Sequence, residues 1–408
     1  MTLQLLKSTI NQKSEIIISG SKSETNRLLL LQALYPEITI QNISNSDDSD
    51  VMSMAIKSQD TIIDVHHAGT AMRFLTAFFA SKVGAEVTLT GSERMQQRPI
   101  KILVDALREL GADIAYTKNE GFPPVKIKGQ KLTNNKISLP ANVSSQYISA
   151  LLLIAPSLPN GLDLALMGQI TSVPYIKMTL DLLSQVGIEN SFIQNQIVVK
   201  NKNTVQKQII SVESDWSSAS YFYSIVALSD VGTQIILSNY KPKSLQGDSQ
   251  LAKIYTHFGV QTFFDGRQIT ILKNKNHKQN HLKLDLNNCP DIAQTIAVTC
   301  FALAIPCQLI GLHTLKIKET DRLEALKTEL SKLGAIISVT NQSLKLETCA
   351  TINKNVTIAT YQDHRMAMAF APLALRTDIN IENADVVSKS YPNYWTDLSK
   401  IGIQINQQ

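Results

Sequence analysis

Polar and cationic residues recur directly ahead of long apolar runs, which is where the N-terminus of a helix is expected. The first case reads "ISGSKSETNR" and continues into "LLLLQAL". Ser, Thr and Asn are good N-caps, and Glu24 fits the first turn of a capping pattern. Lys22 and Arg27 are unexpected there, because a helix N-terminus already carries partial positive charge. A bound anion would relieve that repulsion, although a single such stretch is more often a capped helix with solvated charges.

The same arrangement returns along the chain. The heads "HHAGTAMR", "ERMQQRPI", "KIKETDRLEAL", "QDHRMAMAF" and "SKSYPNYW" contain Gly69, Thr70, Arg73, Arg98, Lys316, Lys318, Glu319, Asp321, Arg322, Asp363, His364, Arg365 and Lys389. Each head has an ordinary interpretation, such as a salt-bridged first turn, a hydrogen-bonded structural His, or pairing of Arg98 with Glu93. Repetition favours a cluster of cations for which the local acids are too few. We therefore expect a substrate with several negative charges.

Two interleaved series of segments reveal an internal repeat. Helix-like segments end at a glycine that suits a C′ position, at Gly111, Gly187, Gly259, Gly334 and Gly402. Apolar helices with polar heads recur at steps of 75, 73, 73 and 73 residues, taking Gly69, Ser144, Ser217, Pro290 and Asp363 as markers. The pattern predicts six copies of an α+β unit and is long for a solenoid. If the buried helices converge at their N-termini, they form a cavity suited to anions.

Length and composition limit the class of protein. The 408 residues suggest two domains, with crossings near Gly20–Ser21 and Glu213–Ser214. A net charge of +5 favours an anionic partner, but no basic block or basic–aromatic stripe indicates nucleic acid. Cys289, Cys300, Cys307 and Cys349 have no metal-ligand spacing and indicate reduced core residues. Without a signal peptide or membrane span, we expect a cytosolic protein, and a monomer.

The ordered set of motifs resembles the enolpyruvyl transferase family, and within it the branch that uses shikimate 3-phosphate. The similar stretches are "GSKSETNR", "AGTAMR", "RPI", "SSQY", "SVPYIKMT", "DWSSASYF", "LQGDS", "PDIA", "KIKETDRL", "DHRMAMAF" and "SKSYPNY". The resemblance implies an α/β fold with an inverse α/β barrel-like arrangement of six βαβαββ repeats, three in each of two domains. It places one domain at 21–213, the other at 1–20 with 214–408, and the active site in the cleft between the domains.

The resemblance also implies a reaction and a set of site residues. The enolpyruvyl group of phosphoenolpyruvate moves to the 5-hydroxyl of shikimate 3-phosphate, releasing phosphate without a metal or cofactor. Expected phosphoenolpyruvate contacts are Lys22, Gly69, Thr70, Arg98, Gln146, Arg322, Arg365 and Lys389. Expected shikimate 3-phosphate contacts are Lys22, Ser23, Arg27, Ser144, Ser145, Gln146, Ser172, Tyr175, Asp291, Thr314 and Lys318. Asp291 is the expected base and Glu319 the expected acid, with Lys22 assisting proton transfer and His364 supporting Glu319.

Three positions depart from the family pattern. His67 stands where Asn is usual, Phe74 where Pro is usual, and Thr314 where a substrate-binding Asn is common. The first two could change sensitivity to inhibitors that mimic phosphoenolpyruvate. A sister enzyme acting on UDP-N-acetylglucosamine is the main competing interpretation, but the loop "GSERMQQRP" lacks the Cys usual there. A basic repeat protein that binds nucleic acid and an inactive homologue are two further interpretations of the same sequence.

Overall fold

The structure, a computed structural model, divides into two compact units. It describes residues 1–140, 144–168, 170, 173–348 and 351–408. Unit 1 contains Met1–Gly20 and Glu213–Gln408, and unit 2 contains Ser21–Val212. Among the described residues, no helix is both long enough and apolar enough to cross a membrane.

Unit 2 alternates helices and short strands. Its elements are α1 Lys22–Leu34, β3 Ile38–Gln41, α2 Asp47–Lys57, β4 Ile62–Asp64, α3 Gly69–Ser81, β5 Glu86–Thr90, α4 Glu93–Gln96, α5 Lys101–Glu109, β6 Asp113–Tyr116, β7 Val125–Lys128, β8 Lys136–Pro140, α6 Ser145–Ile154, η1 Ala155–Ser157, β9 Leu162–Met167, α7 Val173–Gln185, β10 Asn190–Ile193, β11 Gln196–Val199 and β12 Gln208–Ser211.

Unit 1 follows the same alternation, with more short 3₁₀ helices (η). Its elements are β1 Leu3–Leu5, β2 Lys13–Ile16, α8 Trp216–Leu228, β13 Gln234–Ser238, η2 Gly247–Gln250, α9 Leu251–Ile254, η3 Tyr255–Phe258, β14 Val260–Asp265, β15 Gln268–Lys273, β16 Leu282–Asp285, η4 Pro290–Ile292, α10 Ala293–Ala302, β17 Cys307–Ile310, η5 His313–Ile317, α11 Arg322–Lys332, β18 Ile337–Val339, β19 Ser343–Leu346, β20 Val356–Ile358, α12 His364–Phe370, η6 Ala371–Leu375, β21 Ile379–Ile381, η7 Ala384–Lys389, α13 Tyr394–Lys400 and β22 Ile405–Gln407.

One sheet design is repeated. In the order β4-β5-β7-β6, the first pair of strands is parallel and the following contacts are antiparallel. The sheets β8-β9-β11-β10, β2-β13-β15-β14, β16-β17-β19-β18 and β20-β21-β1-β22 share this order, and β12-β3 is a parallel pair alone. In the sheets that begin with β4, β8, β16 and β20, a buried helix joins the two parallel strands, because such a pair needs a crossover. The predicted repeated α/β fold is confirmed, while the described strands form separate open sheets and no closed barrel.

Some repeats are completed by strands that are distant in the sequence. In unit 1, β2 pairs in parallel with β13, so that Lys13 lies opposite Gln234. In unit 2, β12 pairs with β3, so that Gln208 lies opposite Ile38. The N-terminal segment is also tied to the start of α8, because Gly20 forms a bridge with Ser214. Unit 1 therefore depends on both of its chain segments for a complete core, whereas in the continuous unit 2 the β12–β3 pair joins the two ends of one segment.

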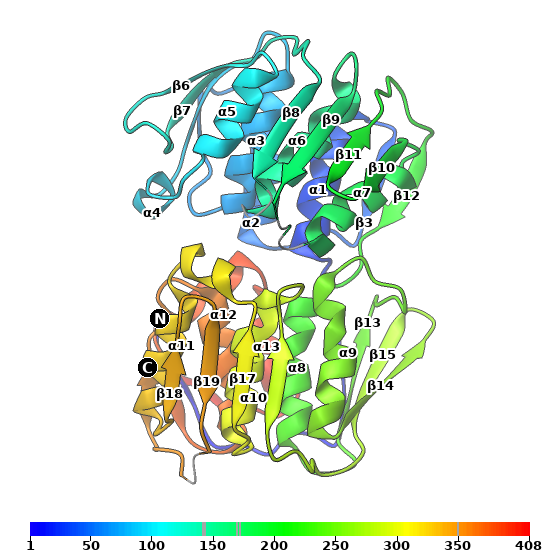
Figure 1. Ribbon diagram of the computed structural model, residues 1–408. Coiled ribbons are helices and arrows are strands. Elements are labelled where there is room, and N and C mark those ends of the chain that lie inside the picture. Colours follow the sequence, from blue (N-terminus) through cyan, green and yellow to red (C-terminus); the bar gives the residue numbers. More distant parts are fainter. Residues whose placement is uncertain (141–143, 169, 171–172, 349–350) are drawn as a thin grey trace. The chain divides into compact units, whose positions relative to one another are not determined.

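Six apolar helices form the interior of the two units. In unit 2, α1, α3 and α6 contact one another, and in unit 1, α10 contacts both α8 and α12. Figure 1 shows the sheets of each unit lying outside these helices. From Ala293 to Ala302 every residue of α10 is buried. The near absence of a polar face in these helices explains why sheets must cover them on several sides.

The predicted glycine positions end the outer helices. Gly111, Gly187, Gly259, Gly334 and Gly402 all have positive φ, between 76° and 112°. After α5, the Ala112 amide donates to the Leu107 carbonyl and the Gly111 amide to the Arg108 carbonyl, both at 2.9 Å. This is the paired bonding of a Schellman motif, which requires a left-handed residue. The motif stops the helix and turns the chain into the next strand.

We expect Gly111→Ala to lower stability through the backbone alone. Gly111 has φ +108° and nothing within 4 Å of where a Cβ would stand, so the substitution adds no clash. The left-handed conformation costs roughly 1–2 kcal/mol for Ala. Thermal unfolding followed by circular dichroism should show a lower melting temperature. Gly111→Asn is the control, because Asn tolerates this region, and equal losses for Ala and Asn would contradict the explanation.

Candidate active site

In unit 2, the N-termini of α3 and α6 meet through side chains that the sequence singled out. Ser144 caps α6, its Oγ accepting from the Gln146 amide at 3.4 Å, and Ser145 is the first helical residue. Gln146 Nε2 donates to Thr70 Oγ1, on the first turn of α3, at 3.2 Å. Amides and hydroxyls of two helix starts are thereby brought to one place, as an anion site requires.

Arg98 lies against the start of α3. A Cβ on Gly69 would stand 2.6 Å from Arg98 Nη1, so a side chain at this position would displace the guanidinium from where it lies. The following carbonyl, of Pro99, accepts hydrogen bonds from Arg73 Nη2 at 3.2 Å and from the Tyr147 hydroxyl at 2.6 Å. The loop that carries Arg98 is thus fixed by Arg73, which the sequence marked at a helix head but did not assign to the site.

Arg27 is buried within unit 2, and its hydrogen bonds go to oxygens that carry no charge. Its guanidinium donates to Thr179 Oγ1 at 2.8 Å, Ser149 Oγ at 3.0 Å, and the carbonyl oxygens of Ser23 at 2.8 Å and Tyr175 at 3.4 Å. Burial lowers the pKa of Arg27 to about 10, and Tyr175 and Glu24 partly offset the shift. A buried cation held by neutral groups is well suited to receive an anion.

Two aromatic rings complete the surroundings of Arg27. Its guanidinium carbon lies 5.4 Å from the ring centroid of Phe74 and 6.0 Å from that of Tyr175. Phe74, the residue that departs from the family's Pro, is fully buried in α3. The departure therefore supplies a cation–π contact to a site residue.

Lys22, the first residue of α1, is paired within unit 2. Its Nζ lies 3.3 Å from Asp48 Oδ2, and His67 Nε2 lies 3.9 Å from Asp47 and 4.0 Å from Asp48. Asp48 was missed by the sequence analysis, although the "SDDSD" stretch at the start of α2 was a signal for acids at a helix N-terminus. Ser172, expected to contact shikimate 3-phosphate, lies outside the described residues.

In unit 1, Arg322 is the centre of a group of carboxylates. Its guanidinium contacts Asp363 at 2.6 Å, Asp291 at 2.8 Å and Glu319 at 2.8 Å. Burial acts to lower the pKa of Arg322, but the three carboxylates raise it, so that the group is firmly cationic. Asp291 lies in η4, Asp363 caps the start of α12, and Glu319 precedes α11. Arg322 therefore joins the starts of these three elements.

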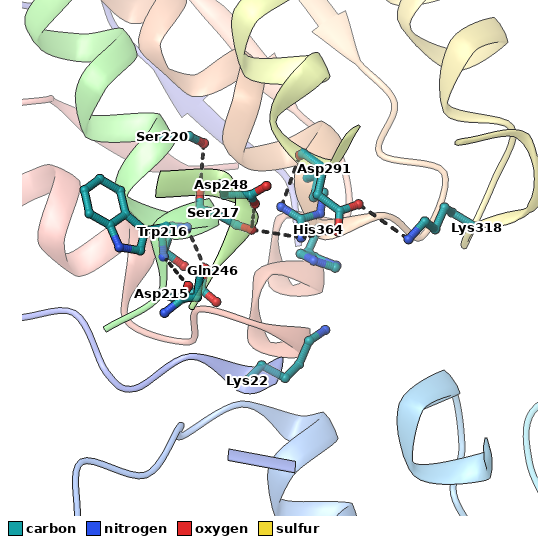
Figure 2. A network of polar contacts seen from close by, with 12 residues as sticks. Lys22, Asp215, Trp216, Ser217, Ser220, Gln246, Asp248, Asp291, Lys318 and His364 are labelled. Carbon is teal, nitrogen blue, oxygen red and sulfur yellow. Dashed lines mark hydrogen bonds and ion pairs between the residues drawn. The ribbon is translucent and has the colours of Figure 1, made fainter. Parts of the chain in front are cut away.

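A second arginine, Arg365, extends this network to Asp291 and Ser217, two residues labelled in Figure 2. Arg365 Nη2 lies 3.4 Å from Asp291 Oδ2 and donates to Ser217 Oγ at 3.3 Å. Lys318 Nζ lies 3.6 Å from Asp291 Oδ1. The start of α8, which carries Ser217, thus meets those of η4 and α12.

Asp248, in η2, is a member that the sequence analysis did not single out. It is buried and accepts a hydrogen bond from the Ser217 hydroxyl. Burial, followed by the charge of Asp291, raises the pKa of Asp248 to about 7, against the opposing effects of Arg365 and Ser217. The stretch "LQGDS", which contains Asp248, is one of those that resemble the family. This resemblance was the signal in the sequence that could have found Asp248.

Three further expected residues, Lys389, His364 and Thr314, also belong to unit 1. Lys389 Nζ donates to the Gln362 carbonyl at 2.7 Å, just before α12. His364 is buried, with Nδ1 3.9 Å from Asp363 Oδ1. The Thr314 hydroxyl is buried and has no hydrogen-bond partner among the described residues. The structure thus places Thr314 in η5, near the start of α11, with a hydroxyl left to be satisfied.

One expectation about charge is wrong for unit 1. The sequence suggested that local acids are too few for the cations, yet Asp291, Glu319 and Asp363 surround Arg322. These acids come from three separate stretches of the chain, so the fold supplies counter-charges that local sequence hides. The expected alternative, an ion pair between Arg98 and Glu93, is not present among the described residues.

Comparisons with known proteins define the class first. Solved structures with the same fold include an EPSP synthase from Acinetobacter baumannii, with a TM-score of 0.79, 20% identity and 100% of both chains covered. The enolpyruvyl transferase NikO from Streptomyces tendae has a TM-score of 0.74 at 13% identity, covering 100% of this chain and 98% of that one. The fold is therefore that of the enolpyruvyl transferases.

The sequence comparisons then give the family. A family model described as EPSP synthase (3-phosphoshikimate 1-carboxyvinyltransferase) matches residues 52–398. A 3-phosphoshikimate 1-carboxyvinyltransferase from Bacteroides fragilis is 47% identical over 405 residues, covering 98% of each chain. One from Colwellia psychrerythraea is 34% identical, covering 95% of this chain and 96% of the relative. The chain belongs to the EPSP synthase family.

We expect Asp248 to make unit 1 less stable as the pH rises. A carboxyl whose pKa is about 7 when folded and near 3.8 when unfolded holds a proton in the folded state between these pH values. Stability therefore falls as pH rises from about 4 to 7. Melting temperatures at pH 5 and pH 8 should show Asp248→Asn gaining on the unsubstituted protein at the higher pH. Asp265→Asn, at an exposed acid, is the control, and a gain independent of pH would contradict the assignment.

Proposed function

We propose that this chain is a 3-phosphoshikimate 1-carboxyvinyltransferase. It transfers the enolpyruvyl group of phosphoenolpyruvate to the 5-hydroxyl of shikimate 3-phosphate and releases phosphate, a step toward chorismate and the aromatic amino acids. The family match and the relatives support this proposal. The observation that carries it is the buried Arg27, whose hydrogen bonds go to hydroxyl and carbonyl oxygens and whose guanidinium lies near two ring faces.

In this proposal unit 2 supplies part of the anion contacts, and Arg322, Arg365 and Lys389 of unit 1 supply the others expected for phosphoenolpyruvate. Arg98 is half-buried against Gly69, and a guanidinium there can accept a carboxylate or phosphate in a forked arrangement. Arg27, Tyr175 and the hydroxyls at the start of α6 would hold shikimate 3-phosphate. Lys22 would approach phosphoenolpyruvate from the start of α1, because its pairing with Asp48 fixes its position. No nucleic acid or cofactor takes part.

Unit 1 would supply the proton transfers. Asp291 lies within reach of Arg322, Arg365 and Lys318, which favour its carboxylate form and so its role as acceptor for the 5-hydroxyl proton. Glu319 would protonate the methylene carbon. Its contact with Arg322 opposes protonation, and the negative charge of bound substrate would offset that effect. His364 would support Glu319, and Arg322 would hold the three acids in place through its contacts with them.

The test is a coupled phosphate-release assay with phosphoenolpyruvate and either of two acceptors. Turnover with shikimate 3-phosphate and none with UDP-N-acetylglucosamine is expected. Turnover only with the sugar nucleotide would overturn the proposal, and the family match and the loop without Cys disfavour that outcome. The cytosolic location and the monomeric state stay predictions.

Arg98→Ala should raise the KM for phosphoenolpyruvate by about 10- to 150-fold, because it removes a charged hydrogen bond to the substrate. Such a bond contributes about 1.5–3 kcal/mol. The Arg98 side chain makes no hydrogen bond among the described residues, so the fold should survive. Arg94→Ala is the matched control, because Arg94 is exposed on the neighbouring helix α4. Steady-state kinetics that are equal for both variants would remove Arg98 from the site.

Phe74→Leu should weaken shikimate 3-phosphate binding selectively. The substitution keeps an apolar buried side chain but removes the ring face 5.4 Å from Arg27, a contact worth about 0.5–2 kcal/mol. We expect the KM for shikimate 3-phosphate to rise roughly 2- to 30-fold while that for phosphoenolpyruvate changes little. Phe78→Leu on the same helix is the control, since its ring faces Lys82 instead. Equal effects on both substrates would indicate general loosening of α3.

A further inference from the structure

Unit 1 contains a cavity of about 320 Å³ that is separate from the network around Arg322. It is lined by the end of α8 and the turn after it, by the end of η6, and by the N-terminal segment from Ser8 to Gln12. Helix α8 has 13 residues, which span about 20 Å at 1.5 Å per residue. Ser217 lies at the opposite end of that helix, so the cavity does not belong to the candidate active site.

Two opposite charges face this cavity without neutralising each other directly. Arg376 is half-buried, and Asp230 is exposed on the turn after α8. Arg376 Nη1 donates to the neighbouring Leu375 carbonyl at 3.3 Å. Burial lowers the pKa of Arg376 and Asp230 counteracts this, yet no ion pair within 4.0 Å joins the two among the described residues. The two side chains thus border the cavity as separate charges of opposite sign.

The helix ends beside the cavity are already satisfied. Lys273 Nζ donates to the Ala227 and Phe258 carbonyls, both at 2.7 Å, and Ser229 Oγ donates to the Ile225 carbonyl at 2.8 Å. The partial negative charge of two helix C-termini therefore offsets the positive charge of Lys273. The local balance favours a ligand with no net charge but with both signs present, rather than a simple anion.

The apolar part of the lining adds a place for a hydrocarbon group. Ile10, Leu228 and Leu375 are buried residues of the wall. A volume of about 320 Å³ is at the lower end of small-molecule sites. The cavity thus offers a carboxylate partner, an ammonium partner and an aliphatic surface within one small volume.

We propose that this cavity binds a small zwitterion with an aliphatic side chain, of the α-amino acid class. Its carboxylate contacts Arg376, its ammonium group contacts Asp230, and its side chain packs on Ile10, Leu228 and Leu375. No bond is made or broken, and the site is independent of the proposed enolpyruvyl transfer.

The experiment compares three probes that share a carbon skeleton. L-leucine carries both charges, 3-methylbutylamine only the ammonium, and 4-methylpentanoate only the carboxylate. Methyl NMR of the full chain should show saturable shifts of the Ile10, Val231 and Leu375 signals with L-leucine. The single-charge probes should bind roughly tenfold or more weakly. Equal binding of all three, or no saturable shift with L-leucine at tens of millimolar, would overturn the proposal.

Matched variants test the assigned charges. Arg376→Gln and Asp230→Asn should each weaken L-leucine binding roughly tenfold. Lys283→Gln and Asp265→Asn, which change exposed charges elsewhere in unit 1, should leave it unaltered. If Arg376→Gln lowers the melting temperature, the probe series on the unsubstituted protein still decides the question. Binding that survives both cavity variants unchanged would refute the assignment, whatever the phosphate-release assay shows.

Discussion

The enclosed guanidinium of Arg322 is the interaction on which unit 1 depends. It is bonded to carboxylates from three separate stretches of the chain, and its side chain is only 2% exposed. Without it, Asp291, Glu319 and Asp363 would repel one another in a place from which water is largely excluded. Because removing one partner leaves an uncompensated buried charge, the starts of η4, α11 and α12 are held together by electrostatics as much as by packing.

Both units bring helix starts together around a buried arginine, but the groups that bind this arginine differ between the units. In unit 2 the hydrogen bonds of Arg27 go to hydroxyl and carbonyl oxygens, and in unit 1 Arg322 is satisfied by carboxylates. A repeated fold fixes where the helix ends lie, but not which side chains stand on them. Unit 2 therefore presents a buried guanidinium bonded to neutral oxygens, and unit 1 presents one bonded to carboxylates.

The sequence predicted the repeat well because its signals are local. Gly111 and Gly402 need positive φ, and apolar helices without a polar face must be buried, so both features are visible in neighbouring residues. The partners of the cations were harder to foresee, because Asp48, Asp248 and Asp363 reach them only through tertiary contacts. Burial of Arg322 likewise could not be read from "KETDR", a stretch that would ordinarily be a solvated first turn.

The departures from the family pattern show how such contacts compensate one another. Where Pro is usual, Phe74 continues α3 without interruption and places its ring beside Arg27. Where Asn is usual, His67 stands about 4 Å from the carboxylates of Asp47 and Asp48, the second of which pairs with Lys22. Phe74 contacts a cation directly, and His67 lies near an acid that pairs with a cation. Neither residue replaces a cation. The charge pattern can therefore stay fixed while the groups that position it vary, and this explains how the departures leave every proposed cation in place.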